Sequence, residues 1–351
     1  MSFPKLIIDL EKIKNNALIV AEESAKRNYE LIGVEKLVAG DLEVAKTLID
    51  AGIKTLADSR IKNLLKLKDL QAKKMLLRIP MLSEIDELVD IVDVCLISEI
   101  QTIIEINKKA KKVIEIILMI ETGDIREGLY DKEIIFSTVE KIKELKNIKL
   151  VGLGTNFACF GATVPSVNKM IELVALKNEI SKKFDIIMPK ISAGSSSHFT
   201  IWDDKKLPVE VNQIRVGAAI LMGIGLNDEP IDFLQQNIFT LQAEIVEIQN
   251  KPSASWGEKG LDAFGREKHF DDIGIRKKAI VALGRQDCPY DEITPVKEHM
   301  KILGQSSDHT ILDITDYEQE LKIGSIIEFK LSYLAVLSLI TSEYVAKTYK
   351  K

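Results

Sequence analysis

Short apolar runs alternate with amphipathic segments from residue 11 to about residue 215, and this alternation limits the possible folds more than any other feature. Between the runs, apolar side chains recur at the three- and four-residue spacing of a helix that covers a core. Runs buried on both faces and joined by helical crossovers are typical of a parallel sheet. We therefore expect a (β/α)8 barrel, with an open doubly wound sheet as the alternative. The eight apolar runs lie near residues 31–34, 54–57, 74–79, 93–97, 113–120, 148–153, 186–191 and 211–215.

Serine or aspartate stands where several of the amphipathic segments begin. Such short side chains accept hydrogen bonds from the first N–H groups of a helix, which have no acceptor inside the helix. The sequence therefore predicts N-caps at Ser59, Ser83, Ser98 and Asp131.

The pattern changes after about residue 230, where β-branched or alternating stretches are separated by Gly, Pro and Asp turns. Since 351 residues exceed what one ordinary core supports, we expect two domains. The prediction is a barrel over residues 1–230 and a mainly β C-terminal domain over residues 231–351. The apolar stretch at 5–10 precedes the first helix and could pair with the second domain.

The composition of the chain argues against several classes of protein. Apolar residues make up 46% and charged residues 29% of the chain, which is typical of a soluble globular protein. No apolar run reaches the length of a membrane span, and the N-terminal stretch does not look like a signal peptide, so we expect a cytoplasmic protein. A net charge of -5 with dispersed Lys and Arg argues against nucleic acid as a partner. Three scattered cysteines and four histidines without ligand spacing predict reduced thiols and no metal site.

Unusual polar residues follow the ends of the apolar runs. The loops after the strands of a (β/α)8 barrel build its active site, so these residues are candidates for function. A lone lysine at a strand end is more often a surface residue, and a Ser-Gly cluster is more often a turn, but here several such features coincide. They are Lys36, Arg78, Arg126, Asn156, the stretch SAGSSSH at 192–198 and the stretch RVGAA at 215–219.

The last two stretches follow the seventh and eighth runs. Barrels of this type often bind a phosphate there with backbone N–H groups, hydroxyls and a helix N-terminus. A phosphate at this position, with Lys36 across the barrel mouth, suggests pyridoxal 5'-phosphate held as a Schiff base.

These residues, in the motifs GVEKLVAGD, TGDIREG, GLGTNFACFGA, QIRVGAAILMG, GRQDC and GQSSDHTILDITD, resemble the alanine/ornithine racemase family of fold-type III pyridoxal-phosphate enzymes. The likeness extends over nearly the whole chain and is greatest to the ornithine racemase-like branch. It implies a racemase that interconverts L- and D-amino acids by exchange of the α-proton. The implied substrate is ornithine, lysine or another basic or small amino acid, and the implied assembly is a head-to-tail homodimer.

The resemblance also implies roles for single residues. Lys36 would bind the cofactor aldehyde and exchange the proton, and Arg215 would face the pyridine nitrogen. Because a guanidinium stays protonated, it donates to a neutral ring nitrogen and weakens the electron sink, which suits a racemase. Asn156 would lie under the ring, and Arg126 near the cofactor hydroxyl and the substrate carboxylate. Further cofactor contacts are implied for Ser195, Ser196, Gly217, Ala218 and Tyr333.

The sequence departs from alanine racemases at the second base. Racemisation is most simply a two-base reaction, and the tyrosine that serves the second face is replaced by Trp256, whose indole is not a usable base. Either another group serves as the base, with Asp308, His309, Asp287 and Cys159 as candidates, or the reaction is not a two-base racemisation. Each also has an ordinary structural role as a turn residue, a strand-edge histidine or a packed thiol.

Two further departures fit the ornithine racemase-like branch. Met119 stands where alanine racemases often carry a modified lysine, and Gly40 replaces their phosphate-binding tyrosine. Ser195 is also unusual within the branch, and His198 is expected to open a helix.

Acidic residues of the second domain are candidates for substrate binding. Ser307 and Asp308 would reach the cofactor of the partner subunit. A substrate with a side-chain ammonium needs a carboxylate to offset its desolvation, and Asp287 and Asp308 are the acids we place there. Both are also compatible with solvated turns.

Two other functions are compatible with the same residues. One is a related fold-type III D-amino-acid lyase or aldolase, although the metal pair common in such enzymes is not evident. The other is a non-catalytic pyridoxal-phosphate-binding protein, which Trp256 favours and the second domain disfavours.

Overall fold

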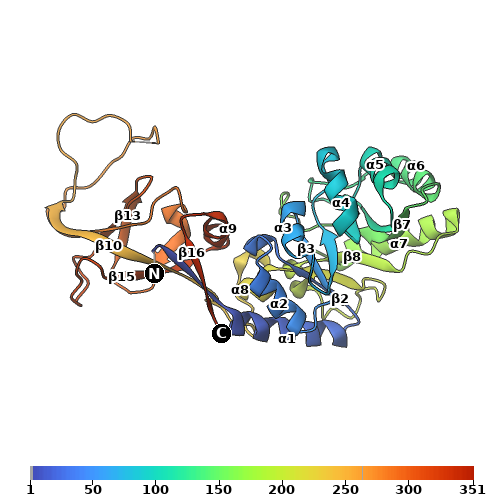
Figure 1. Cartoon of the computed structure of the whole chain (residues 1–351), viewed down its shortest axis with the longest axis horizontal. Helices are drawn as coiled ribbons and strands as arrows, with labels where there is room; N and C mark the ends of the chain where they lie inside the picture. Colours follow the sequence, from blue (N-terminus) through green and yellow to red (C-terminus); the bar gives the residue numbers. More distant parts are fainter. Residues whose placement is uncertain (1–2, 263) are drawn as a thin grey trace. The chain divides into compact units, whose positions relative to one another are not determined.

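The computed structural model describes residues 3–262 and 264–351, which fall into two compact units (Figure 1). One unit is Leu10–Gln236, and the other combines the N-terminal segment up to Asp9 with Asn237–Lys351. Among the described residues, no helix is both long and apolar enough to cross a membrane.

Eight parallel strands close into a barrel within Leu10–Gln236. Each predicted apolar run overlaps one strand, in chain order, and the last strand pairs with the first, with Arg215 opposite Ile32. The predicted (β/α)8 barrel is therefore confirmed, and the open-sheet alternative is wrong. The strands are β2 (Glu30–Val34), β3 (Thr55–Asp58), β4 (Lys73–Leu76), β5 (Val94–Ile97), β6 (Ile114–Met119), β7 (Ile148–Gly154), β8 (Lys190–Gly194) and β9 (Gln213–Val216).

Helices surround these strands, as Figure 1 shows. Each longer helix buries residues at three- and four-residue spacing, for example Ile13, Ala17 and Val20. The helices are α1 (Leu10–Lys26), α2 (Leu42–Asp50), α3 (Ile61–Lys66), α4 (Ile85–Ile91), α5 (Ile100–Lys109), α6 (Lys132–Lys143), α7 (Val167–Phe184) and α8 (Ala218–Met222). Short 3-10 helices of this unit are η1 (Lys36–Val38), η2 (Leu82–Glu84), η3 (Ser196–Thr200) and η4 (Leu226–Asp228).

The predicted N-caps are only partly right. Asp131 caps α6 and accepts from the N–H groups of Glu133 and Ile134, as predicted. Arg60 and Glu99 occupy the N-cap positions expected for Ser59 and Ser98, and Ser83 lies inside η2. Near α3 the carboxylate of Asp58 accepts from the Arg60 N–H at 2.8 Å, while the Glu99 carboxylate accepts from the Gln101 N–H at 3.2 Å. Longer acidic side chains thus supply the acceptors expected from the serines.

Apolar side chains pack the barrel interior. Because side chains alternate along a strand, Ile32 and Val34 share this face. Gly33 faces the other way, since a Cβ on it would lie 3.1 Å from Ile53 and 3.2 Å from Leu48. The core cluster comprises Ile32, Val34, Ala57, Met75, Val94, Leu96, Ile117, Met119 and Val151. This filled interior leaves the ends of the barrel for polar groups.

The second unit is an antiparallel β domain with one helix, in agreement with the predicted fold class. Its longest strand pairs with three others, and the N-terminal strand pairs with both the longest and the last strand. The predicted β-stretch SIIEFKLSYL ends at Leu331, because Ser332 caps a helix by accepting from the Ala335 N–H at 3.1 Å. The elements are β1 (Lys5–Asp9), β10 (Phe239–Pro252), β11 (Ile275–Val281), η5 (Tyr290–Glu292), β12 (Ile293–Pro295), β13 (Lys301–Gln305), β14 (Thr310–Asp313), β15 (Ile326–Leu331), α9 (Tyr333–Thr341) and β16 (Ala346–Lys350).

Candidate functional site

The predicted site residues of the barrel lie at one end of it. They follow or end β2, β6, β7, β8 and β9, and the carboxyl ends of parallel barrel strands meet at a single mouth. The barrel therefore brings together residues that are separated by up to 182 positions of sequence, from Lys36 to Ala218 (218 − 36).

Lys36 begins η1, directly after β2 and Glu35. Its side chain is exposed, and no hydrogen bond or ion pair joins its amine to any residue that the structure describes. The loop behind it is tightly packed at Gly40, which has a φ of +64°. A Cβ there would lie 2.7 Å from the backbone oxygen of Asn63, so no side chain fits at this position unless the loop shifts.

Two buried acids stand beside this lysine loop. Glu35 is fully buried, and neither of its carboxylate oxygens has a hydrogen-bond partner within residues 3–262 and 264–351. Burial, and then the charges of Asp58 and Asp41, raise the pKa of Glu35 well above its ordinary value. Asp58 Oδ1 accepts from the Arg60 N–H and from Asn63 Nδ2 at 3.0 Å, and burial raises the pKa of Asp58 as well. Burial thus favours the neutral forms of both acids.

Arg215 lies in β9, the strand that pairs with β2, and its guanidinium is buried. Its Nη1 donates to the backbone oxygen of Ser192 at 2.6 Å and to the Ser192 hydroxyl at 2.5 Å. Its Nη2 donates to the Thr155 oxygen at 2.8 Å and to Asn156 Oδ1 at 3.0 Å. All four acceptors are neutral, and Nε takes no part in these bonds. Burial lowers the pKa of Arg215 to about 10, so the group remains protonated near pH 7.

Asn156 connects Arg215 to Arg126 through a residue that the sequence reasoning missed, Glu127. Asn156 Nδ2 donates to Glu127 Oε1 at 2.8 Å, and Arg126 Nη2 donates to the same oxygen at 2.8 Å. Arg126 Nε also pairs with Glu127 Oε2. The only signal in the sequence is that a carboxylate directly follows Arg126 in TGDIREG.

The loop after β7 is held by a second missed residue, Asp124. The N–H groups of Cys159, Phe160 and Gly161 converge on Asp124 Oδ1 at 3.1, 3.3 and 3.2 Å. Asp124 is buried, whereas Cys159 is exposed. Since successive N–H groups around one carboxylate form a well-defined anion nest, the loop that carries Asn156 and Cys159 is fixed in position.

The loops after β8 and β9 meet beside β2. The Ser196 hydroxyl accepts from the Ala219 N–H at 3.0 Å, and Ser195 Oγ lies 2.8 Å from Ser197 Oγ. A Cβ on Gly217 would lie 3.1 Å from Val34 Cβ, so this loop contacts the strand that ends next to the lysine. The N–H groups of Gly217 and Ala218 precede the first turn of α8 and have no acceptor inside that helix.

His198 does not open a helix, and that prediction is wrong. It lies within η3, is buried, and its Nε2 is 3.0 Å from the Tyr29 hydroxyl. Burial lowers the pKa of His198 to about 4, so it is a neutral core residue.

The predicted residues of the β unit form a group of their own. The loops around Gly284 and Ser307 lie side by side, because a Cβ on Gly284 would be only 1.9 Å from the Ser307 oxygen. The Gln286 N–H donates to that oxygen at 3.1 Å. Asp287 accepts from the Ser342 hydroxyl at 3.2 Å, and the Ser307 hydroxyl donates to Asp308 at 2.8 Å. The two acids expected near a substrate ammonium thus stand on adjoining loops.

The other predicted residues of this unit are His309, Tyr333 and Trp256. His309 is exposed, and its Nδ1 lies 3.5 Å from the Ser306 hydroxyl. Tyr333 is the first residue of α9. Trp256 follows β10, and 82% of it is exposed.

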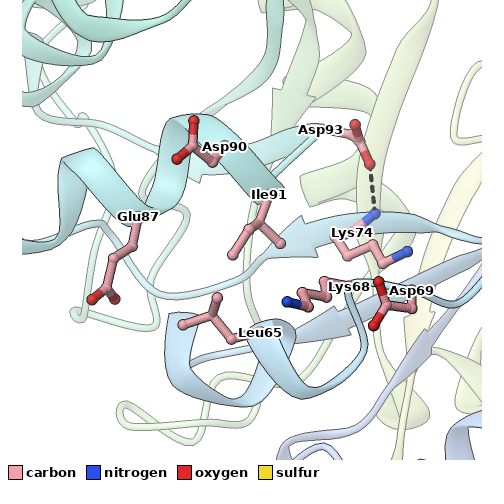
Figure 2. A pocket seen from close by; sticks show the side chains of 8 residues that line it. All are labelled: Leu65, Lys68, Asp69, Lys74, Glu87, Asp90, Ile91 and Asp93. Carbon is pink, nitrogen blue, oxygen red and sulfur yellow. Dashed lines mark hydrogen bonds between the residues drawn. The ribbon is translucent and has the colours of Figure 1, made fainter.

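A pocket of about 560 Å³ lies elsewhere on the barrel, and Figure 2 shows its lining. Lys74 stands near the start of β4, and Asp93 directly precedes β5, so the pocket is at the amino end of these strands. The Lys74 amine donates to the backbone oxygens of Leu70 and Ala72, and the backbone N–H of Lys74 donates to the Asp93 carboxylate at 2.9 Å. Conserved structure at that end of a barrel serves stability, whereas chemistry belongs to the carboxyl end. The pocket is therefore not the candidate site.

Comparison with known proteins agrees with the barrel fold. Residues 8–224 match the family model described as alanine racemase, N-terminal domain. The chain belongs to the alanine racemase family. This family member is 38% identical to ornithine racemase of Acetoanaerobium sticklandii over 349 residues, covering 98% of this chain and 99% of that protein. It is 37% identical to lysine racemase of Thermotoga maritima over 356 residues, covering 100% and 99%.

Solved structures of the alanine racemase family share the fold of this member. Alanine racemase of Clostridium difficile superposes with a TM-score of 0.80 at 18% identity, covering 100% of this chain and 96% of the other. A barrel followed by an antiparallel β domain is thus retained where most side chains differ.

Proposed function

We propose that this protein is a pyridoxal-phosphate-dependent racemase of basic amino acids, with ornithine or lysine as substrate. The near full-length identity to an ornithine racemase and a lysine racemase supports both the reaction and the substrate class. The observation that carries the proposal is the barrel mouth itself. This end of the barrel carries Lys36, whose amine has no partner among the described residues, and the buried guanidinium of Arg215, which neutral acceptors hold in place.

The residues at the mouth fit pyridoxal 5'-phosphate. Because the four bonds of Arg215 use only its terminal nitrogens, Nε–H is the donor available to a pyridine nitrogen. Ser196, Gly217 and Ala218 would bind the phosphate through a hydroxyl and N–H groups, with Ser195 beside them and Tyr333 from the β unit. When bound, the cofactor withdraws electrons from the substrate α-carbon and so acidifies its proton.

Lys36 would hold and move that proton. An amine must be unprotonated to act as nucleophile and base, and a neighbouring carboxylate would stabilise its protonated form. No carboxylate pairs with Lys36 among the described residues, and burial raises the pKa of the adjacent Glu35, which favours its neutral form. Arg126 would bind the substrate carboxylate as a bidentate partner, and the Asn156 amide would lie against the cofactor ring.

The second face of the α-carbon needs a group other than Trp256. Cys159 is the candidate on the barrel, exposed on the loop that Asp124 holds. Asp287, Asp308 and His309 are the candidates of the β unit, and Ser307 stands next to them. We propose that they serve a head-to-tail homodimer in the cytoplasm, in which the β unit completes a partner's site and Asp287 or Asp308 binds the substrate ammonium.

The test is incubation of the purified, cofactor-loaded protein with each enantiomer of ornithine, lysine and alanine in deuterium oxide. We expect both enantiomers to appear by chiral chromatography, faster with ornithine or lysine than with alanine, and deuterium at the α-carbon by mass spectrometry. Keto acid or aldehyde products would instead identify a lyase. Unchanged enantiomers without deuterium would identify a non-catalytic binding protein, which Trp256 otherwise favours.

A further inference from the structure

The four residues Arg126, Glu127, Asn156 and Arg215, here called the relay, form a continuous chain of hydrogen bonds across the mouth. Glu127 accepts from Arg126 and from Asn156 at 2.8 Å each, and Asn156 accepts from Arg215 at 3.0 Å. Cation, carboxylate, amide and cation thus follow one another, with the amide as the only neutral member.

The chemistry at each end fixes the orientation of the Asn156 amide. A guanidinium only donates, so it requires the amide oxygen, and a carboxylate only accepts, so it requires the amide nitrogen. A flipped amide would face Arg215 with a donor and Glu127 with an acceptor, losing both bonds. Glu127 therefore determines which atom of Asn156 meets Arg215.

Glu127 also supplies the negative charge that the buried Arg215 lacks in direct contact. The four acceptors of Arg215 are neutral, and the side chain of Glu127 is only 18% exposed. Burial is the main cause that lowers the pKa of Arg215; the charge of Arg126 lowers it further, and that of Glu127 acts in the opposite direction. A partly buried carboxylate two hydrogen bonds away thus stabilises the buried cation.

We propose that Glu127 is a positioning residue that fixes the Asn156 amide and thereby couples the substrate-binding Arg126 to the cofactor-facing Arg215. The proposal rests on the proposed function for the roles of the two arginines, but the relay itself is a property of the free chain. The Glu127 carboxylate binds the edge of the Arg126 guanidinium formed by Nε and Nη2. It therefore sets the position in which Arg126 meets a substrate carboxylate.

A charge swap along the relay tests this coupling. Asn156→Asp alone places two carboxylates against each other, whereas adding Glu127→Gln restores a donor facing an acceptor at every link. In the protein without cofactor we expect Asn156→Asp to lower the Tm by about 5 °C and Glu127→Gln by about 2 °C, but the double variant by about 2 °C rather than by their sum. Additive shifts would overturn the proposal whether or not the protein is a racemase.

The loaded enzyme gives a second, independent readout. We expect Glu127→Gln to raise KM for the amino acid about tenfold while kcat changes less than about threefold, because Arg126 loses its charged partner but the amide keeps an acceptor. We expect Asn156→Asp to lower kcat about 100-fold and to shift the absorbance maximum of the bound cofactor, and the double variant to recover both in large part. An unchanged KM in Glu127→Gln together with no recovery in the double variant would contradict the coupling.

Glu115→Gln is the matched control. Glu115 lies at the amino end of β6, where its carboxylate is 3.4 Å from the Lys73 amine and its side chain is 25% exposed. We expect its KM and cofactor absorbance to match the wild type. If Asn156→Asp does not fold alone but the double variant does, that rescue supports the relay; if neither folds, the KM of Glu127→Gln decides. A protein that shows the coupled Tm shifts but no racemisation would retain the relay and lose the proposed function.

Discussion

The two flanks of the barrel mouth differ in how completely their polar groups are hydrogen-bonded. On the paired flank, after β6 to β9, both terminal nitrogens of Arg215 and the whole Asn156 amide are satisfied. On the unpaired flank, after β2 and β3, Lys36 has no partner, and Glu35 and Asp58 leave buried oxygens without donors, all within the described residues.

The two flanks meet different requirements of one site, a fixed guanidinium and a reactive amine. Buried polar groups are normally hydrogen-bonded, and an unsatisfied one costs about 1–3 kcal/mol. Arg215 and Asn156 of the paired flank avoid that cost through their mutual bonds, which suits a fixed electrostatic partner for the cofactor. The unpaired flank retains it, and a lysine that must react and exchange protons gains from having no competing partner.

The strongest test of the unpaired flank is Lys36→Ala. We expect racemase activity to fall by at least about 10⁴-fold, since the variant lacks both nucleophile and base. Borohydride reduction should no longer attach the cofactor covalently, as mass spectrometry of the intact protein would show. The Tm should stay within about 1 °C of the wild type, because an exposed side chain without partners contributes little to stability.

Lys46→Ala is the control for this variant, since it removes an exposed lysine of the neighbouring helix α2. It should keep both activity and covalent cofactor. Covalent labelling that persists in Lys36→Ala and disappears in another lysine variant would move the proposed site to that other lysine.

Arg215→Lys tests the paired flank. We expect its effect on activity to be smaller than that of Lys36→Ala. An ammonium keeps the charge but lacks the planar fork, so it cannot satisfy Ser192, Thr155 and Asn156 together. We expect a loss of about 2–4 kcal/mol in the free energy of unfolding and a fall in kcat of about 100-fold or more. Denaturant unfolding and steady-state kinetics measure the two effects. A variant as stable as the wild type would show that the fork is not what holds this flank together.

The barrel and one part of the paired flank could be predicted because their signals are local. Helical spacing and apolar runs depend on neighbouring residues. The strand ends then identify the loops that carry Lys36, Arg126, Asn156 and Arg215. The role of Glu127 could not be read in this way. Its bond to Asn156 joins residues 29 positions apart, and only the closed barrel sets that distance.

The unpaired flank was less accessible to prediction for a different reason. Glu35 in GVEKLVAGD reads as a surface acid, because carboxylates are rarely buried without a partner. The structure buries it completely. Ser59 likewise reads as an N-cap, but the Asp58 carboxylate bonds the Arg60 N–H instead, and such competition between adjacent side chains depends on tertiary position.

Glu35→Gln should change how the stability of the protein depends on pH. The pKa of Glu35 is raised in the folded protein, so above the ordinary value of 4.5 the native state retains a proton that the unfolded chain loses. Wild-type stability therefore falls as pH rises between the unfolded and folded pKa values, and glutamine removes this fall. We expect the variant to match the wild type near pH 4 and to exceed it at pH 8, by about 1.4 kcal/mol for each pH unit of that interval.

Thermal unfolding of both proteins from pH 4 to pH 8 measures this difference. Glu22→Gln, an exposed acid of α1, is the control and should follow the wild-type profile. Parallel profiles for Glu35→Gln and the wild type would mean that Glu35 has found a partner in solution.

The smallest expected effect is that of Gly40→Ala, which tests whether the loop behind Lys36 is rigid although the Lys36 amine and the Glu35 carboxylate have no partner among the described residues. Alanine at a φ of +64° costs about 1–2 kcal/mol by backbone strain alone, and its Cβ would also meet the Asn63 oxygen at 2.7 Å. Gly52→Ala is the matched control, because Gly52 also has a positive φ but nothing within 4 Å of an added Cβ. We expect Gly40→Ala to lower the free energy of unfolding more than Gly52→Ala does, and to lower kcat as the lysine loop shifts. Equal losses of unfolding free energy in the two variants would mean that the loop moves to accommodate the methyl group. The backbone of the unpaired flank would then be flexible.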